Sequence, residues 1–157
     1  MRILIDADGC PVVDATVMLA QEYELECIIL CDTAHYFNKA GARTVVLSQG
    51  ADSVDFALVN MVQAGDIVVT QDYGLAAMCL ARRSRPINQN GMRYHEGNID
   101  SLLASRHTAR KIRRGGGRTK GPSRRTKEQD EAFVRQLRQL ILTGLAEENN
   151  SMKTVTQ

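Results

Sequence analysis

Short, uniformly apolar runs alternate with longer amphipathic stretches from the first residues of the chain. A run such as Ile3-Leu4-Ile5 is too short for a helix and has no polar face, so it predicts a strand that is buried on both sides. The longer stretches repeat apolar residues at helical spacing, as Val54, Leu58 and Met61 do. We therefore expect strands at residues 2–6, 26–31, 44–48 and 66–70, and helices that begin at Pro11 and that span residues 52–63 and 74–83.

Turn and cap signals are clearer in the second half of the chain. Asn90-Gly91 is a strong hairpin-turn pair, and it predicts a small β-ribbon between residues 86–89 and 92–94. Asn98 is placed to cap a helix that runs toward Ile112, and a run of glycines stops that helix.

Strands that alternate with helices predict a parallel sheet covered on both faces. We expect an α/β three-layer sandwich with a central, mainly parallel sheet, a small β-hairpin and a C-terminal helix. Thr126 and Gln129 form a capping box for that last helix. The length of 157 residues fits a single domain over residues 1–145, followed by a polar, flexible tail over residues 146–157 that frays from its start.

Composition narrows the class of protein. Hydrophobic residues make up 43% and charged residues 24% of the chain, which is ordinary for a soluble globular protein. No apolar run approaches membrane-spanning length, and residues 1–20 carry acids where a signal peptide carries bases, so we expect a cytoplasmic protein without a membrane partner. The four cysteines form no CxxC pair and are interpreted as structural thiols.

Charge is distributed very unevenly along the chain. Residues 1–105 carry 7 basic and 13 acidic side chains, whereas residues 106–127 carry 10 basic and no acidic ones. An acidic body with one concentrated basic segment suggests a polyanionic partner. Low aromatic content, 4%, argues against a base-stacking platform of the usual single-strand-binding type.

Aspartates follow two of the predicted buried strands. Asp6 and Asp8 end the first strand, and Asp72 follows the fourth. Open α/β sheets bind ligands outside the carboxyl ends of their strands, so these acids are expected to meet at one site. Asp55 and Asp52 share a face near the start of a helix, although Asp52 has an ordinary explanation as a helix cap. Asp66 is explained equally well as part of a turn beside a glycine.

Such a cluster of carboxylates is typical of a binding site for a hard divalent cation. Oxygen ligands are those that Mg²⁺ and Mn²⁺ prefer, and a bound ion of this kind polarises a phosphodiester and lowers the pKa of a bound water. His35 and Tyr36 follow the second strand and could line the same cleft, but loop packing explains them more simply.

Several motifs together resemble one bacterial family. They are Asp6-Ala7-Asp8-Gly9-Cys10-Pro11-Val12, Gly50-Ala51-Asp52-Ser53-Val54-Asp55, Gly65-Asp66-Ile67-Val68-Val69-Thr70-Gln71-Asp72 with Leu75-Ala76-Ala77, then Tyr94, Asn98-Ile99-Asp100 with Leu102-Leu103, Arg106, and Gly117 through Gly121-Pro122. The chain is similar over nearly all of residues 1–145 to the YaiI/YqxD family, which is grouped by fold with PIN-like nucleases. Gly9 stands where the family pattern has alanine.

The resemblance implies a PIN-like sandwich. It matches Asp6, Asp55 and Asp72 to the acidic positions of PIN-like nucleases and makes Asp8 an extra ligand for Mg²⁺ or Mn²⁺. The family is one of unknown function, so a metal-dependent nuclease, with RNA favoured over DNA, is an expectation by analogy of fold and acids.

The basic segment is the second functional candidate. Arginine and lysine near a helix end that is followed by glycines can grip phosphates while the backbone approaches closely, although a solvated linker is an equal alternative. The residues expected to bind nucleic acid are Arg106, Arg110, Lys111, Arg113, Arg114, Arg118 and Lys120.

Two other functions stay open on the sequence. A haloacid-dehalogenase-like phosphatase also begins with a strand that ends Asp-x-Asp-Gly, and it would use Asp6 as nucleophile and Asp8 as acid and base. Cys10 and the position of Lys39 depart from that pattern. A non-catalytic nucleic-acid or protein binding module is the other alternative.

Overall fold

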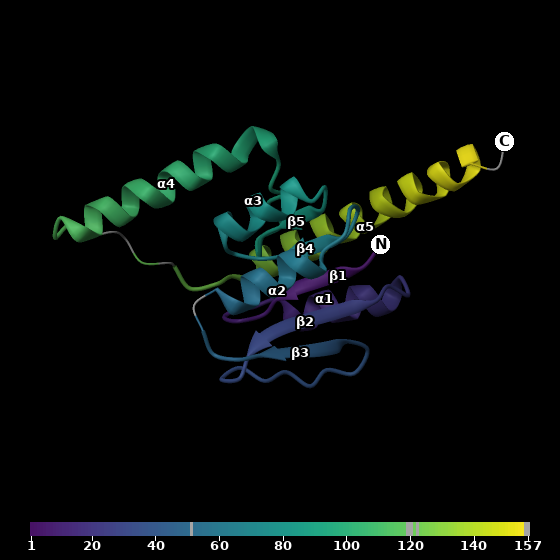
Figure 1. Ribbon diagram of the computed structural model, residues 1–157, viewed down its shortest axis with the longest axis horizontal. Coiled ribbons are helices and arrows are strands. Elements are labelled where there is room, and N and C mark those ends of the chain that lie inside the picture. Colours follow the sequence, from purple (N-terminus) through teal and green to yellow (C-terminus); the bar gives the residue numbers. More distant parts are fainter. Residues whose placement is uncertain (51, 119–120, 122, 156–157) are drawn as a thin grey trace.

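A fully parallel sheet of five strands organises the part of the chain that the computed structural model describes, residues 1–50, 52–118, 121 and 123–155. The strands lie in the order β3-β2-β1-β4-β5. They are β1 (Ile3–Asp6), β2 (Cys27–Asp32), β3 (Arg43–Leu47), β4 (Ile67–Val69) and β5 (Arg85–Ile87). The helices are α1 (Val13–Glu22), α2 (Ser53–Met61), α3 (Tyr73–Ala81), α4 (Glu96–Arg114) and α5 (Lys127–Val155) (Figure 1).

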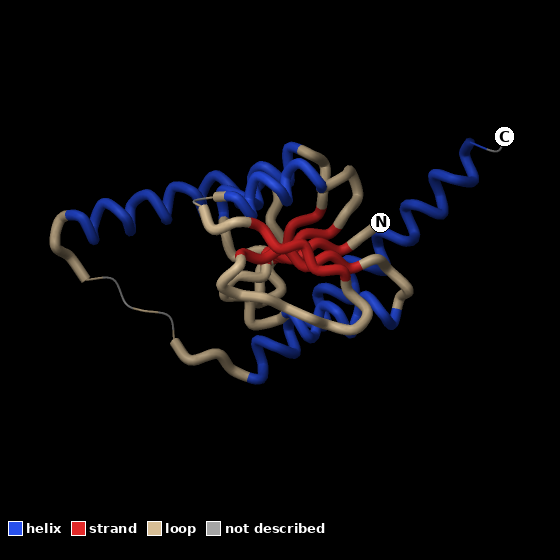
Figure 2. The backbone as a smooth tube through the Cα atoms, turned by 60° about the horizontal axis from the view of Figure 1, so that its bottom comes forward, coloured by secondary structure: helices blue, strands red, loops and turns tan. Residues whose placement is uncertain are grey.

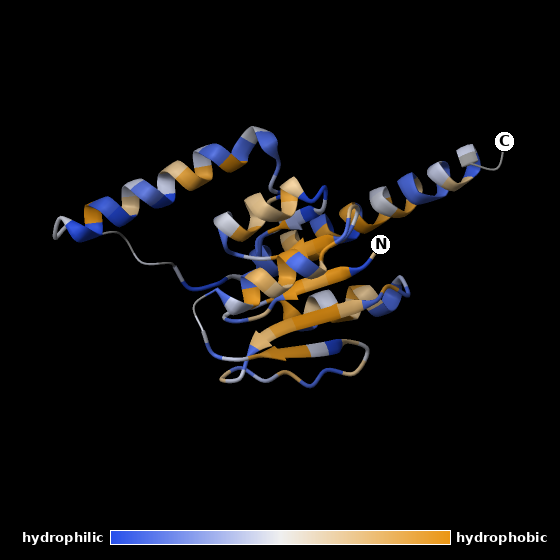
Figure 3. Cartoon of the chain, in the orientation of Figure 1, coloured by the Kyte–Doolittle hydropathy of each residue, from blue (hydrophilic) through white to orange (hydrophobic). Residues whose placement is uncertain are grey.

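Helices cover both faces of this sheet, so the predicted three-layer α/β sandwich is confirmed (Figure 2). Successive residues of a strand point to opposite faces. Ile3 and Ile5 therefore enter the core beneath α1 and α5, whereas Leu4 enters the core beneath α2 and α3. All three are fully buried, and β1 and β2 are almost entirely hydrophobic in Figure 3. Burial on both faces explains why the strands read as continuous apolar runs.

The predicted β-ribbon is reduced to one bridge. Arg85–Ile87 pairs in parallel with β4 as the edge strand β5, and among the described residues a single antiparallel bridge joins Ile87 to Arg93. Pro86 is tolerated in β5 because an edge strand has one side without a ladder partner. The turn itself is present, with Gly91 at φ +86°.

The sequence predicted capping residues for α4 and α5, and the structure shows both caps. His95, not Asn98, caps α4: its Nδ1 accepts from the backbone N–H of Gly97, and Asn98 Oδ1 accepts from the backbone N–H of His95 at 2.9 Å. The capping box at α5 is confirmed, because Thr126 Oγ1 accepts from the backbone N–H of Gln129 and Gln129 Oε1 accepts from that of Thr126.

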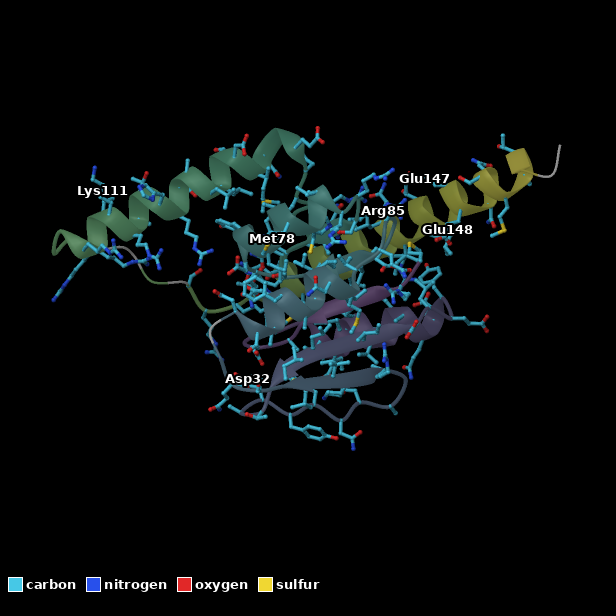
Figure 4. All side chains as sticks on the ribbon, viewed as in Figure 1. Asp32, Met78, Arg85, Lys111, Glu147 and Glu148 are labelled. Carbon is cyan, nitrogen blue, oxygen red and sulfur yellow. The ribbon has the colours of Figure 1, made fainter. Side chains whose placement is uncertain are left out.

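The helix α5 continues to Val155, past Glu147, where the polar tail was expected to begin. Residues 156–157 of that tail lie outside the described residues. Two ion pairs hold this part of the helix at the amino end of the sheet: Glu147 pairs with Arg85, and Glu148 pairs with the terminal ammonium of Met1 at 2.7 Å (Figure 4). Polar composition alone did not reveal these partners. No helix among the described residues is both long and apolar enough to cross a membrane.

The cysteines behave as structural thiols, as predicted. All four are free, and Cys27, Cys31 and Cys79 are buried. Burial raises the pKa of the Cys27 thiol to about 12 and that of Cys79 to about 12 as well. Thiols with such pKa values carry almost no thiolate at neutral pH and are therefore inert.

Apolar contacts anchor the beginning of α4 to the body of the molecule. Ile99, Leu102 and Leu103 pack with Tyr94 and with residues of α3. Beyond Leu103 almost every residue of the helix is exposed. The helix leaves the body of the molecule from the end at which the strands finish (Figure 1).

Asp66 is a structural residue, as expected from its place in a turn. Its side chain is only 3% exposed and pairs with Arg2 at 2.6 Å. Asp66 also accepts from the backbone N–H groups of Arg2 and Gln63, each at 2.9 Å. These bonds join the starts of β1 and β4 to the end of α2.

We predict that Asp66→Ala lowers the free energy of unfolding by about 3 kcal/mol, because it leaves a partly buried guanidinium and two backbone amides without their acceptor. Urea denaturation measures the change. A loss below about 0.5 kcal/mol would contradict a structural role for this carboxylate.

Candidate aspartate pocket

The strand order creates a switch point beside β1. After β1 the chain builds β2 and β3 on one side, and it then crosses to build β4 and β5 on the other. Connections on either side of such a point leave a crevice outside the carboxyl ends of the two central strands. Asp6 ends β1, and Asp72 lies at the N-cap of α3 just after β4, so both acids stand at this crevice.

A pocket of about 500 Å³ occupies the crevice, a volume within the range of ligand sites. Arg106 is the one basic side chain among its lining residues in the described part of the chain. Opposing it are six carboxylates from four parts of the fold: Asp6, Asp8, Asp32, Asp52, Asp55 and Asp72. The structure thus gathers all four aspartates that the sequence singled out, Asp6, Asp8, Asp55 and Asp72, around one pocket.

Asp6 and Asp72 are linked through Thr70. The Thr70 hydroxyl donates to Asp6 Oδ2 at 2.8 Å and accepts from the backbone N–H of Asp72 at 3.0 Å. Asp72 Oδ1 in turn accepts from the backbone N–H of Leu75 at 3.0 Å, which caps α3. The two carboxylates therefore have fixed positions relative to the sheet, as a preorganised site requires.

Burial sets the electrostatics of Asp6. Desolvation raises its pKa to about 6, against the effect of the Thr70 hydrogen bond, and the nearby charges of Asp55, Asp8 and Asp72 raise the pKa further. The pKa of Asp55 is also raised, chiefly by burial and then by Asp72 and Asp52. Arg106 offsets part of the shift at Asp55. The ionised pocket holds more negative charge than its own protein partners balance.

Asp52 does not act as the helix cap that its sequence context suggested. Its side chain accepts no capping hydrogen bond, and its backbone is left-handed, with φ +64°. A non-glycine residue rarely takes this conformation, although aspartate takes it more readily than most. The side chain lines the pocket instead.

Asp32 is the residue that sequence reasoning missed. Asp8, Asp32 and His35 each offer a ligand atom within 4.8 Å of the others, and within the described residues no other trio of metal-ligating side chains is this close. His35 Nδ1 lies 2.9 Å from Asp32 Oδ1 and 3.5 Å from Asp8 Oδ1. The signal was present, because Asp32 ends an apolar strand just as Asp6 does (Figure 4).

Asp6, Asp55 and Asp72 surround the same pocket at wider spacing. His35, which the sequence offered as a cleft residue, belongs to the cluster with Asp8 and Asp32. Tyr36, offered with it, is 69% exposed and does not line the pocket.

The basic residues divide into two groups. Arg106 reaches the pocket, where its Nη1 donates to Asp72 Oδ1 at 3.3 Å. Farther along α4, a shallow hollow of about 240 Å³ is lined by His107, Arg110, Lys111 and Arg114. Lys111 lies well away from the body of the molecule in Figure 4.

Arg113 and Arg118 are exposed, and Lys120 lies outside the described residues. The structure therefore brings one of the expected nucleic-acid-binding residues to the pocket and places five others outward along α4 and just beyond it.

Comparison with known protein families gives a match that spans nearly the whole of this fold. Residues 4–143 match the family described as "Uncharacterized BCR, YaiI/YqxD family". The chain belongs to the YaiI/YqxD family. The match covers every strand of the sheet except the first residue of β1, together with the pocket and α4, so the predicted family membership is confirmed.

Individual relatives are similar to this chain over most of its length and most of their own. A "UPF0178 protein" of Exiguobacterium sibiricum is 55% identical over 90% of this chain and 96% of its own length. Proteins of the same name from Ruminiclostridium cellulolyticum and Clostridium kluyveri are 50% and 49% identical, over 87% and 92% of this chain and 90% and 95% of their own lengths. No solved structure matches the YaiI/YqxD chain.

The raised pKa of Asp6 predicts how stability changes with pH in the absence of metal. In the folded protein, Asp6 keeps its proton up to about pH 6. In the unfolded chain the same carboxyl group has the ordinary pKa of 3.8 and loses its proton at lower pH. Stability therefore falls as pH rises from about 4 to about 6. We expect Asp6→Asn to raise the free energy of unfolding at pH 7.5 by up to about 3 kcal/mol.

Urea denaturation with a chelator present, at pH 4 and at pH 7.5, measures this effect. The advantage of the variant should disappear at pH 4, where Asp6 is largely protonated in the folded wild type. A variant that is less stable than the wild type at pH 7.5 would show that burial of the ionised Asp6 carboxylate does not destabilise the folded protein.

Proposed function

We propose that the aspartate pocket binds divalent metal ions, Mg²⁺ or Mn²⁺, and hydrolyses phosphodiester bonds in nucleic acid, with RNA preferred to DNA. The observation that supports this most strongly is the convergence of six carboxylates with one arginine at the switch point of the sheet. Ionised together, these groups repel one another in a partly buried space. A divalent cation removes that repulsion and is the partner that the donor set fits.

The donors suit a hard ion. All but one of the candidate ligands are carboxylates, and Mg²⁺ and Mn²⁺ favour oxygen. The closest trio is Asp8, Asp32 and His35, whereas Asp6, Asp55 and Asp72 are spaced more widely. Mg²⁺ commonly retains several waters, so carboxylates at wider spacing can serve it through water.

Such an ion, when bound, polarises a phosphoryl oxygen and lowers the pKa of a coordinated water. The protein's own groups would do the rest. Arg106 can leave Asp72 and bind a phosphate oxygen of the substrate, because a guanidinium pairs with carboxylate and phosphate oxygens alike. The Thr70 hydroxyl fixes Asp6, one of the pocket's lining residues, by donating to its Oδ2.

The exposed half of α4 would hold the substrate backbone outside the pocket. Arg106, Arg110 and Arg114 follow one another at four-residue spacing and therefore share a face of the helix. Basic groups in such a row contact successive phosphates and carry no sequence preference of their own.

A non-catalytic nucleic-acid-binding module remains the second candidate, and the same row of basic residues favours it. The phosphatase alternative has less support. A lysine is part of that chemistry, but none lines the pocket among the described residues, and Lys39 pairs with Asp14 at 2.7 Å.

We predict that Asp6→Asn and Asp72→Asn each lower Mn²⁺-dependent hydrolysis of single-stranded RNA by more than about 100-fold. Loss of a residue that merely supports a metal ligand costs about 10–100-fold, so loss of a ligand should cost more. Circular dichroism should show that both variants remain folded. Asp100→Asn, an exposed carboxylate on α4 outside the pocket, is the matched control and should retain full activity.

Removal of two cations from the row on α4 should weaken nucleic-acid binding in a salt-dependent way. For Arg110→Ala/Arg114→Ala we expect the slope of log affinity against log salt to become shallower by about 1.4, since each phosphate contact on a single strand contributes about 0.7. Fluorescence anisotropy with labelled RNA at several salt concentrations measures it. Lys127→Ala/Arg135→Ala on α5 removes the same charge elsewhere, and an equal effect there would contradict the proposed row.

A further inference from the structure

A second hollow opens beside the aspartate pocket, between α2 and α3. Its volume is about 280 Å³, and Asp52, Asp55, Asp72 and Arg106 line both hollows. The remaining lining residues are apolar or lack a side chain: Phe56, Gly74, Leu75 and Met78. The two hollows thus place charged groups suited to a phosphate next to a surface suited to an uncharged ring.

Phe56 is unusually exposed for its position. The apolar face of α2 is turned into the core through Val54 and Leu58, whereas Phe56 lies outside that face with 61% of its surface exposed. Met78, on α3, is 37% exposed (Figure 4). Single exposed apolar residues are common on protein surfaces. Phe56 and Met78, however, line the same hollow beside the charged pocket.

Gly74 keeps this hollow open. It lies in the first turn of α3, where glycine is less favourable for helix stability than alanine. A Cβ atom at this position would lie 3.2 Å from Asp72 Oδ1. A side chain there would crowd the Asp72 carboxylate and fill part of the hollow.

We propose that this hollow is a nucleobase subsite, which receives the base of a nucleotide whose phosphate lies in the aspartate pocket. The inference rests on the proposed function and extends it to the group beside the phosphate. An aromatic ring stacks on any base, because every base has a π-face, and a methionine thioether packs well against flat rings. Arg106, which lines both hollows, is placed to contact the phosphate between them.

The charge of the rim favours a base over an acyl chain or an apolar peptide side chain. Asp52, which is not among the metal ligands proposed above, supplies carboxylate acceptors at the rim of the apolar surface. The N–H groups at the edge of a base can donate to such acceptors, whereas an aliphatic chain would leave them unpaired.

The test compares ligands that share a sugar and a phosphate and differ in the base. Adenosine 5′-monophosphate, uridine 5′-monophosphate and ribose 5-phosphate are titrated by calorimetry into the Mn²⁺-loaded full chain. The wild type should bind the two nucleotides on the order of 10-fold more tightly than ribose 5-phosphate, since stacking on one ring supplies a factor of this size.

The variants separate the subsite from the phosphate site. Phe56→Ala should remove the preference for nucleotides and leave ribose 5-phosphate binding unchanged, while Phe56→Tyr should retain it. Tyr36→Ala, which removes an exposed ring outside both hollows, should have no effect. The thermal midpoint of Phe56→Ala should match that of the wild type, because the ring is mostly exposed.

Equal binding of all three ligands to the wild type, or a nucleotide preference that survives Phe56→Ala, would overturn the subsite and leave the proposed function standing. Absence of binding by all three would overturn the phosphate site, and the subsite with it.

Discussion

The double burial of β1 is the constraint on which the rest of this structure depends. Ile3, Leu4 and Ile5 are fully buried between two helical layers, so the strand has no freedom to slip. Because β1 runs parallel to both β2 and β4, its last residue, Asp6, stands at the same edge as Asp32 and Asp72. The apolar core thereby fixes the positions of carboxylates that would otherwise move apart.

Those carboxylates give the site its character. The start of α2 adds Asp52 and Asp55 to the same pocket, and the loop after β1 adds Asp8. Arg106 is the one basic side chain that opposes them among the described lining residues. The pKa of Asp6 is raised to about 6 chiefly by burial, because the fold desolvates this carboxylate and only the Thr70 hydrogen bond opposes the shift. A bound cation would stabilise a site built in this way. This supports our proposal of metal-dependent phosphate chemistry over a purely structural role. In the proposed function, the basic row on α4 and the hollow at Phe56 would contact parts of the substrate outside this centre.

Much of this could be predicted because the local signals and the tertiary structure agree. Apolar runs predicted the buried strands, and acids at their ends predicted that Asp6 and Asp72 would share a pocket. Asp32 could have been found by the same rule. Other features have no local signal in the sequence. They are the left-handed backbone of Asp52, the parallel pairing of Arg85–Ile87 despite Pro86, and the ion pairs of Glu147 and Glu148 with Arg85 and Met1. The exposure of Phe56 is of the same kind, since helical spacing does not say which aromatic residue stays outside the core.

Calorimetric titration of Mn²⁺ into the wild type and into Asp6→Asn and Asp72→Asn, at pH 7.5 and moderate salt, tests the central claim most directly. We expect saturable binding to the wild type and its loss or marked weakening in both variants. Identical binding curves for all three proteins, or no binding to the wild type at millimolar Mn²⁺, would contradict it.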